Sequence, residues 1–332
     1  MLLKVKGLAC NINEPIIGYI TRDVAKNDKN FILIAEENIP QIGRFSAILT
    51  QKYAESTKVS NPTVLGVSTF EHLSEGDIVC VNSDGVINTL YRVNSYHNSL
   101  LTTERCNSNC LMCSQPPKDR NDIPYLMHIH KKLIPLIPKN CMELGITGGE
   151  PTLLGNDFFE LLSLIKQELP ETEVHCLTNG RTFAWKNVAK NLGKMEYRQL
   201  MLGVPIYSDY YQLHDYIVQA QNAFNQTILG LYNLAEQNVR IEIRIVLHKL
   251  TIPRLVKLAK YIYKNLPFVE HIAFMGLENQ GYTPHNINKL WIEPTEYMNQ
   301  LAEAIEYLDY RGLNVSIYNT QLCILPKNLV TF

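Results

Sequence analysis

Three cysteines stand close together with the spacing C-x3-C-x2-C: Cys106, Cys110 and Cys113. Thiolate sulfur is a soft ligand that selects zinc, copper(I) or iron–sulfur clusters. A closed zinc site takes four ligands, but the next cysteine is Cys141 and the next histidine is His128. A [4Fe-4S] cluster held by three thiolates would instead leave one iron open to a substrate or cofactor. The motif by itself leaves both metals open.

The remaining five cysteines are isolated along the chain. The N-terminus lacks the apolar core of a signal peptide, and charges interrupt every apolar stretch well short of the about 18 residues of a membrane span. We therefore expect a cytoplasmic protein with no membrane segment, where thiols stay reduced. We expect the isolated cysteines to be mostly small buried hydrophobic residues. They are Cys10, Cys80, Cys141, Cys176 and Cys323.

The charge of the chain is nearly balanced. It has 332 residues, with 31 Lys and Arg against 32 Asp and Glu, and a formal net charge of −1. No broad basic surface is therefore expected, which argues against a nucleic-acid partner. With 46% hydrophobic residues, the chain can bury the core of one large α/β domain and a smaller one.

Residues 1–97 are predicted to form a β-rich N-terminal domain. Short apolar runs separated by turn signals predict strands at 2–6, 16–21, 31–35, 63–68, 77–82 and 85–93. The sequence Asn82-Ser83-Asp84-Gly85 is typical of a hairpin turn, since glycine adopts positive φ at little cost. An exposed edge strand of such a domain could hold a peptide by strand addition.

From residue 98 the pattern changes to alternating strands and helices, which indicates a parallel sheet built from βαβ units. We expect a partial (β/α)6 barrel over 98–320, with six strands after the cysteine motif, and a C-terminal tail over 321–332. The predicted strands are 99–103, 143–147, 173–177, 199–206, 239–247, 269–275 and 314–318. The predicted helices are 123–136, 157–169, 183–192, 220–237, 253–264 and 295–311.

Active sites in such sheets lie at the carboxyl ends of the strands. The cysteine motif follows the first strand, and Gly148-Gly149-Glu150 follows the second. The two glycines would let a backbone approach a ligand closely, and Glu150 adds a carboxylate. Asn179 follows the third strand and Arg244 lies on the fifth. The remaining strand-end loops are Tyr207-Ser208-Asp209 and Gly276-Leu277-Glu278.

The two motifs in this order resemble the radical S-adenosylmethionine (SAM) superfamily, which carries C-x3-C-x2-C after the first barrel strand and Gly-Gly-Glu after the second. The resemblance covers about residues 99–320. It implies a [4Fe-4S] cluster held by the three cysteines, and SAM chelated at the open iron. An electron from the cluster would cleave SAM and leave a 5′-deoxyadenosyl radical that abstracts hydrogen. The resemblance therefore favours iron–sulfur over zinc.

The resemblance also implies residues that bind SAM. Backbone carbonyls of Gly148 and Gly149 would face the ammonium group, and Glu150 would offer it a complementary charge. The residue before the third cysteine is often aromatic in this family; here it is Met112, whose thioether can make similar apolar contact with adenine. By their positions, Asn179 and Arg244 are candidates for ribose or carboxylate contacts. No catalytic side chain is singled out.

Four further stretches resemble the His-Xaa-Ser system radical SAM maturases, in their HxsC-like branch. They are residues 103–117, 274–278, 290–292 and 315–319, and this narrower resemblance covers about two-thirds of the chain. It implies a small His-Xaa-Ser repeat peptide as substrate and a second radical SAM maturase as partner. An electron donor such as flavodoxin or ferredoxin would reduce the cluster. The family pattern usually continues into a cysteine-bearing tail, so either the sequence is truncated or Cys323 has no cluster to serve.

We therefore expect an enzyme: a radical SAM peptide maturase. One alternative is a radical SAM enzyme that acts on a small molecule or RNA. The other is a scaffold without catalytic activity that uses a metal only to fold and holds a peptide for its partner enzyme. Iron and zinc analysis after anaerobic purification distinguishes these classes, since stoichiometric zinc without iron would exclude the radical chemistry.

Overall fold

The computed structural model describes residues 3–35, 44–53 and 60–332. The described strands form one sheet of eight strands and one of seven. The chain divides into two compact units. The first comprises Met1–Leu100, Pro124–Leu144 and Glu160–Thr172, and the second comprises Leu101–Ile123, Gly145–Phe159 and Glu173–Phe332.

The eight-stranded sheet lies in the first unit and has the order β1-β8-β7-β3-β4-β5-β6-β2. Its first and last strands follow one another in the chain with only Gly7 between them, and they pair with β8 and β6 respectively. One continuous segment therefore joins both ends of the order, so the sheet closes on itself. The strands are β1 Lys4–Lys6, β2 Leu8–Cys10, β3 Ile16–Thr21, β4 Phe31–Ile34, β5 Ala47–Leu49, β6 Thr63–Leu65, β7 Ile78–Val81 and β8 Val86–Tyr91.

The β-rich N-terminal region is confirmed, and so is the hairpin turn at 82–85, where Gly85 has φ +82°. The predicted strand 2–6 is described only from Leu3, because Leu2 lies outside the described residues. The expectation of an exposed edge strand is wrong, since the described strands at both ends of the order belong to the closing segment. The sequence analysis also missed the three-residue strands β2 and β5, which are too short to show an alternating pattern.

The seven-stranded sheet runs in the order β15-β14-β13-β12-β11-β10-β9, so each strand lies beside its neighbour in sequence. The pairs from β11 to β15 are parallel. The strands are β9 Asn98–Leu101, β10 Glu143–Thr147, β11 Glu173–Leu177, β12 Leu200–Pro205, β13 Arg240–Leu247, β14 His271–Gly276 and β15 Asn314–Tyr318.

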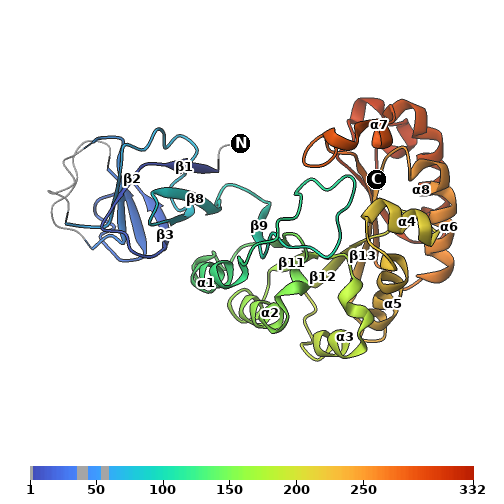
Figure 1. Ribbon diagram of the computed structural model, residues 1–332, viewed down its shortest axis with the longest axis horizontal. Coiled ribbons are helices and arrows are strands. Elements are labelled where there is room, and N and C mark those ends of the chain that lie inside the picture. The colour runs from blue at the N-terminus through green and yellow to red at the C-terminus, as the bar shows by residue number, and fades with distance from the viewer. Residues whose placement is uncertain (1–2, 36–43, 54–59) are drawn as a thin grey trace. The chain divides into compact units, whose positions relative to one another are not determined.

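Helices connect these strands, and in Figure 1 α3, α5, α6 and α8 lie along one side of the sheet. The helices are α1 Ile123–Leu133, α2 Asn156–Glu168, α3 Lys186–Gly193, α4 Tyr211–Val218, α5 Ala223–Ala235, α6 Leu255–Asn265, α7 Ile287–Leu290 and α8 Met298–Asp309. The α/β partial barrel is confirmed, with six β/α units and, as the seventh predicted strand, β15. The sequence analysis missed the short helices α4 and α7.

Strand β13 shows how the sequence sets the two faces of this sheet. Ile241, Ile243 and Ile245 are fully buried, whereas Glu242 and Arg244 alternate with them and therefore point to the opposite face. We call this opposite face the inner face. A parallel strand covered by helices on one side only can place charged side chains on the other.

Four of the five isolated cysteines are buried as predicted: Cys10, Cys80, Cys141 and Cys176. The prediction is wrong for Cys323, which is exposed in the short turn Leu322–Ile324. Among the helices of the described ranges, none combines the length and apolar character needed to span a membrane.

Candidate functional site

The cysteine motif forms a loop between β9 and α1 that is anchored by its own backbone. The N–H groups of Asn109 and Leu111 donate to the carbonyl oxygens of Val218 and Ile217 at 2.9 Å each, at the end of α4. Helix α4, which the sequence analysis missed, therefore holds the middle of the loop. On the far side, the N–H of Tyr282 donates to the Cys113 carbonyl at 2.9 Å.

Met112 belongs to the part of the loop that is buried. It packs with Leu111 in an apolar cluster that also contains Tyr207, Ile217 and Leu290, and only 7% of its surface is exposed. This packing fixes the loop between Cys110 and Cys113. Contact between Met112 and an adenine ring stays a prediction.

The start of the loop is held by polar groups from the turn after β11. Asn179 donates from Nδ2 to Oδ1 of Asn107 at 2.6 Å. The guanidinium of Arg181 donates to the carbonyl of Asn107 and, at 3.2 Å, to Oγ of Ser108. Arg181 is a residue that the sequence analysis did not select, although it lies two positions after the predicted Asn179.

The three thiols lie in a poorly solvated environment and influence one another. Burial raises the pKa of Cys106 to about 11, and the charges of Glu150 and Cys113 act in the same direction. Burial also raises the pKa of Cys110 and of Cys113 above the usual thiol value. Thiols in such surroundings keep their protons until a metal replaces them, because metal binding releases protons from its ligands.

The donor set suits a cluster better than a single ion. In the described part of the chain, no group of three His, Cys, Asp or Glu side chains is arranged to hold one metal ion. A tetrahedral zinc site requires its ligands to converge on one point. In a [4Fe-4S] cube each thiolate binds a different iron, so the three thiols of this loop need not converge on one point.

The turn after β10 packs directly against the segment that leads into the cysteines. Gly149 N–H donates to the Thr103 carbonyl at 2.7 Å, and Glu150 N–H donates to the Arg105 carbonyl at 2.8 Å. Gly148 has φ +149°, and a Cβ at Gly149 would overlap the carbonyl oxygen of Arg105. The close approach that these glycines permit is therefore to the chain's own backbone next to Cys106.

Glu150 is fully buried, and its carboxylate accepts four hydrogen bonds. Oε1 accepts from Thr152 N at 3.0 Å, from Thr152 Oγ1 at 2.7 Å and from Thr178 Oγ1 at 2.7 Å. Oε2 accepts from Asn179 N at 2.7 Å. These bonds join the turn after β10 to the turn after β11. That the carboxylate also offers its charge to an ammonium group stays a prediction.

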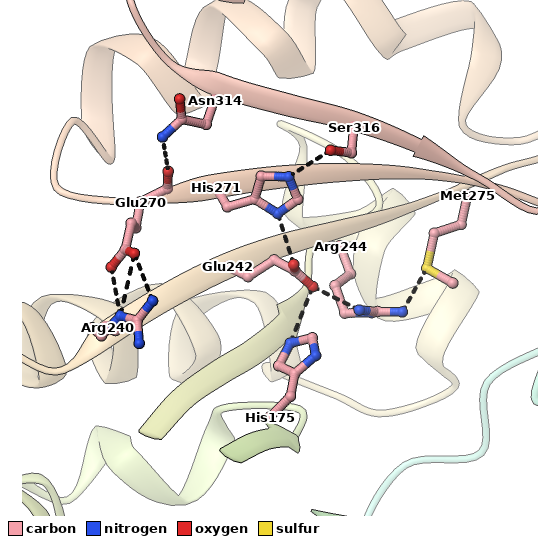
Figure 2. A network of polar contacts seen from close by, with 9 residues as sticks. All are labelled: His175, Arg240, Glu242, Arg244, Glu270, His271, Met275, Asn314 and Ser316. Carbon is pink, nitrogen blue, oxygen red and sulfur yellow. Dashed lines mark hydrogen bonds and ion pairs between the residues drawn. The ribbon is translucent and has the colours of Figure 1, made fainter. Parts of the chain in front are cut away.

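The structure thus brings together the cysteine loop, the Gly148–Glu150 turn and Asn179, but Arg244 belongs to a different group. Its Nη1 donates to Oε1 of Glu242 at 2.6 Å and its Nη2 to Sδ of Met275 at 3.0 Å, as Figure 2 shows. Glu242 also contacts His175 and His271. A contact between Arg244 and the cofactor stays a prediction.

Charges of both groups act on Tyr207. Burial raises the pKa of its phenol well above the usual value; the charges of Cys110 and Cys113 raise it further, whereas that of Arg244 lowers it. It follows the end of β12 by two residues, in the strand-end loop Tyr207-Ser208-Asp209. The sequence analysis selected that loop because it follows the carboxyl end of a strand, but no feature of the sequence distinguished Tyr207 within it.

Two cavities are relevant to this end of the sheet. One of about 590 Å³ borders the loop at Cys106–Asn109 and is lined on other sides by Pro117–Asp119, Leu153 and Gln219. A larger one of about 650 Å³ lies around Arg198 and Arg240, at the amino ends of strands β12 and β13. The first borders the cysteine loop at the carboxyl ends of the strands, so it is the cavity of interest for the chemistry of that loop.

The strand order, the anchored three-thiol loop and the glycine turn define a radical SAM domain. Residues 100–262 match the sequence profile of the Radical SAM superfamily. The stretch lies within the 98–320 region predicted from the sequence.

Individual relatives are more distant. A Methanocaldococcus jannaschii protein named as a glycyl-radical enzyme activating enzyme is 25% identical over 232 residues, which cover 67% of this chain and 54% of the relative. The crystal structure of Streptococcus suis SuiB bound to its precursor peptide SuiA has a TM-score of 0.55 at 15% identity, covering 69% of this chain and 49% of SuiB. This likeness shows the fold, and the chain spans about half the length of each of these two relatives.

Proposed function

We propose that this protein is a radical SAM enzyme that modifies a polypeptide, and that its substrate is a His-Xaa-Ser repeat peptide. The main structural support for this enzyme class is a pair of backbone hydrogen bonds. The N–H groups of Gly149 and Glu150 donate to the carbonyls of Thr103 and Arg105. This pairing holds the first cysteine beside the glycine turn within a domain of the superfamily.

The chain's own residues have distinct parts in the proposal. Cys106, Cys110 and Cys113 would hold a [4Fe-4S] cluster, which when bound supplies the electron that cleaves SAM. The backbone carbonyls of Gly148 and Gly149 would receive the SAM ammonium. Glu150 positions this turn through its four hydrogen bonds. Asn179, fixed to Asn107, would lie near the ribose.

The peptide substrate is supported by two observations of different weight. SuiB, which shares the fold, is known with its precursor peptide bound. The HxsC-like stretches of this sequence support the narrower substrate and a second maturase as partner. The reduced thiols and the expected electron donor, flavodoxin or ferredoxin, suit a cytoplasmic setting.

The cluster assignment is tested by iron analysis and SAM cleavage. We expect Cys106→Ala, Cys110→Ala and Cys113→Ala each to lose the cluster and the formation of 5′-deoxyadenosine under reducing anaerobic conditions. Cys141→Ala and Cys176→Ala are matched controls, because both thiols are buried elsewhere and should leave iron content unchanged. Iron lost from Cys141→Ala but kept in Cys113→Ala would refute the ligand assignment.

The substrate is tested by mass spectrometry of a His-Xaa-Ser repeat peptide. The peptide is incubated with the reduced enzyme, SAM and the second maturase, and a mass change that depends on Cys106 is expected. A peptide of the same composition with its His and Ser positions exchanged is the control. An unchanged peptide in the presence of active SAM cleavage would exclude this substrate and leave the radical SAM assignment intact.

A further inference from the structure

The inner face of the seven-stranded sheet carries a hydrogen-bonded chain of three side chains from three adjacent strands. Oε2 of Glu242 on β13 lies 2.7 Å from Nδ1 of His271 on β14, and Nε2 of His271 lies 3.0 Å from Oγ of Ser316 on β15. Figure 2 shows this chain running from the carboxylate to the hydroxyl. Both distances are those of a carboxylate that orients an imidazole base toward a hydroxyl.

The bonding pattern defines the role of each group. Glu242 is only 3% exposed, and although burial itself raises the pKa of a carboxyl, the bonds from His175 and His271 hold that of Glu242 well below its usual range. The carboxylate is therefore ionised and fixes the proton of His271 on Nδ1. Nε2 is then left as an acceptor for the Ser316 proton.

The two carboxylate oxygens of Glu242 serve different partners. Oε1 accepts from Arg244 Nη1 at 2.6 Å and lies 3.3 Å from His175 Nε2, so Oε2 is left for His271. Gly203 makes this possible, because a Cβ there would lie 2.9 Å from His175 Nε2 and 3.0 Å from Arg244 Cδ. The charge of Arg244 therefore compensates the buried carboxylate without displacing His271.

Arg244 is also placed to serve a group bound at Ser316. Arg244, Ala273 and Ser316 occupy one row of the register across β13, β14 and β15, with the small Ala273 between the two longer side chains. The hydrogen bonds described for Arg244 go to Glu242 and to the thioether of Met275, which is a weak acceptor. Arg244 has five N–H groups, so beyond these two described bonds it can donate to a further acceptor in the row that it shares with Ser316.

We propose that Ser316, His271 and Glu242 form a base-activated serine that reacts with acyl groups, with Arg244 as the donor to the carbonyl oxygen. In this step Ser316 Oγ bonds to the carbonyl carbon of an ester, thioester or amide, and its proton passes to Nε2 of His271. The carbonyl electron pair moves onto the oxygen beside Arg244. When the carbonyl re-forms, the leaving group departs with the proton from His271. Water then bonds to the acyl carbon and gives a proton to His271. The acyl–Ser316 bond breaks, the acid leaves and Ser316 takes the proton back, with no change in oxidation state.

This activity is separate from cluster chemistry, so the full-length protein can be tested whether or not iron is loaded. A fluorophosphonate, which reacts with activated serines, is the probe, and intact mass and peptide mapping locate the adduct. We expect one adduct, on Ser316, that is absent in Ser316→Ala. His271→Gln should slow labelling about 10²-fold or more, as loss of a general base does. His285→Gln, which alters an exposed histidine outside this group of side chains, should label at the wild-type rate.

Circular dichroism and the unfolding midpoint show whether each variant is folded. If His271→Gln does not fold, labelling of Ser316 in the wild-type protein still tests the proposal. Absence of an adduct on Ser316 with excess reagent would overturn the proposal. So would an undiminished rate in folded His271→Gln. Iron content and SAM cleavage measured on the same samples report on the proposed radical SAM function separately.

Discussion

Individual residues were identified best where a motif fixes their type and spacing. Cys106, Cys110 and Cys113 and the Gly148–Glu150 turn were selected from the sequence, and the structure places the turn against the segment before Cys106. The hydrogen bonds of Glu150 could not be predicted, because its partners Thr178 and Asn179 follow another strand, about 28 residues further along the chain. Pairings between strands are not recorded in local sequence.

Glu150→Gln should destabilise the protein by roughly 2 kcal/mol or more, because the amide brings N–H donors to a buried position that faces only donors. The shift is measured as the urea unfolding midpoint of the metal-free protein. Glu171→Gln is the matched control, since Glu171 is exposed just before β11. A midpoint for Glu150→Gln equal to that of the control would mean that the four hydrogen bonds contribute little.

The buried histidines His214 and His248 predict a loss of stability in mild acid. Burial lowers the pKa of His214 to about 4 and that of His248 to about 3, below the value of an unfolded histidine. Between pH 6.5 and 4 the unfolded chain therefore binds protons that the folded chain does not, so the stability present above pH 6.5 falls as pH is lowered. Each histidine contributes about 1.4 kcal/mol per pH unit in this range.

The test is the unfolding midpoint at pH 7 and at pH 5.5. His214→Asn keeps an acceptor for the Tyr207 N–H, which now donates to His214 Nδ1 at 3.3 Å, but cannot titrate. It should reduce the difference between the two pH values by about half. His285→Asn alters an exposed histidine and should leave the difference unchanged. Equal pH dependence in wild type and His214→Asn would contradict the assignment.

At the scale of elements, the alternation of strands and helices after residue 98 predicted the sheet well. The long elements with a clear period were all found. The elements that were missed, β2, β5, α4 and α7, have three to eight residues, a length at which a period is hard to recognise. The omission of α4 mattered, because its end carries Ile217 and Val218, which anchor the cysteine loop.

The contact between the turn after β10 and the cysteine segment can be tested at Gly149. Gly149→Ala should lower the iron bound per chain after anaerobic reconstitution, because its Cβ would overlap the Arg105 carbonyl and separate the turn from the cysteine segment. Gly155→Ala is the matched control: φ is +62° and nothing lies within 4 Å of the added Cβ, so it costs about 1 kcal/mol of strain but keeps its iron. Normal iron with weakened SAM binding in Gly149→Ala would show that the glycine contacts SAM instead.

At the scale of the whole molecule, the sequence could not show how the units are composed. The predicted boundary at residue 97 follows the change of pattern, and we keep it as a proposal. The first unit nevertheless includes Pro124–Leu144, which carries α1. Tyr125 in α1 donates to Oδ1 of Asn82 at 2.7 Å, and the Tyr19 hydroxyl donates to the Leu136 carbonyl at 2.5 Å. Contacts between segments more than 40 residues apart leave no periodic signal.

These contacts predict that the segment around α1 depends on the closed N-terminal sheet. Tyr19→Phe and Tyr125→Phe each remove one hydroxyl from the full chain and should lower the free energy of unfolding by about 1 kcal/mol. The loss should be larger for Tyr19, because its bond to Leu136 is partly buried whereas that of Tyr125 is exposed. Tyr310→Phe is the control, since Tyr310 is 87% exposed. Hydrogen exchange shows which segment is destabilised. In Tyr19→Phe we expect faster exchange across residues 123–136, because the bond from Tyr19 to Leu136 holds α1 and the turn after it. Unchanged exchange there, with faster exchange confined to β3, would show that α1 is held by its own packing and not by the N-terminal sheet.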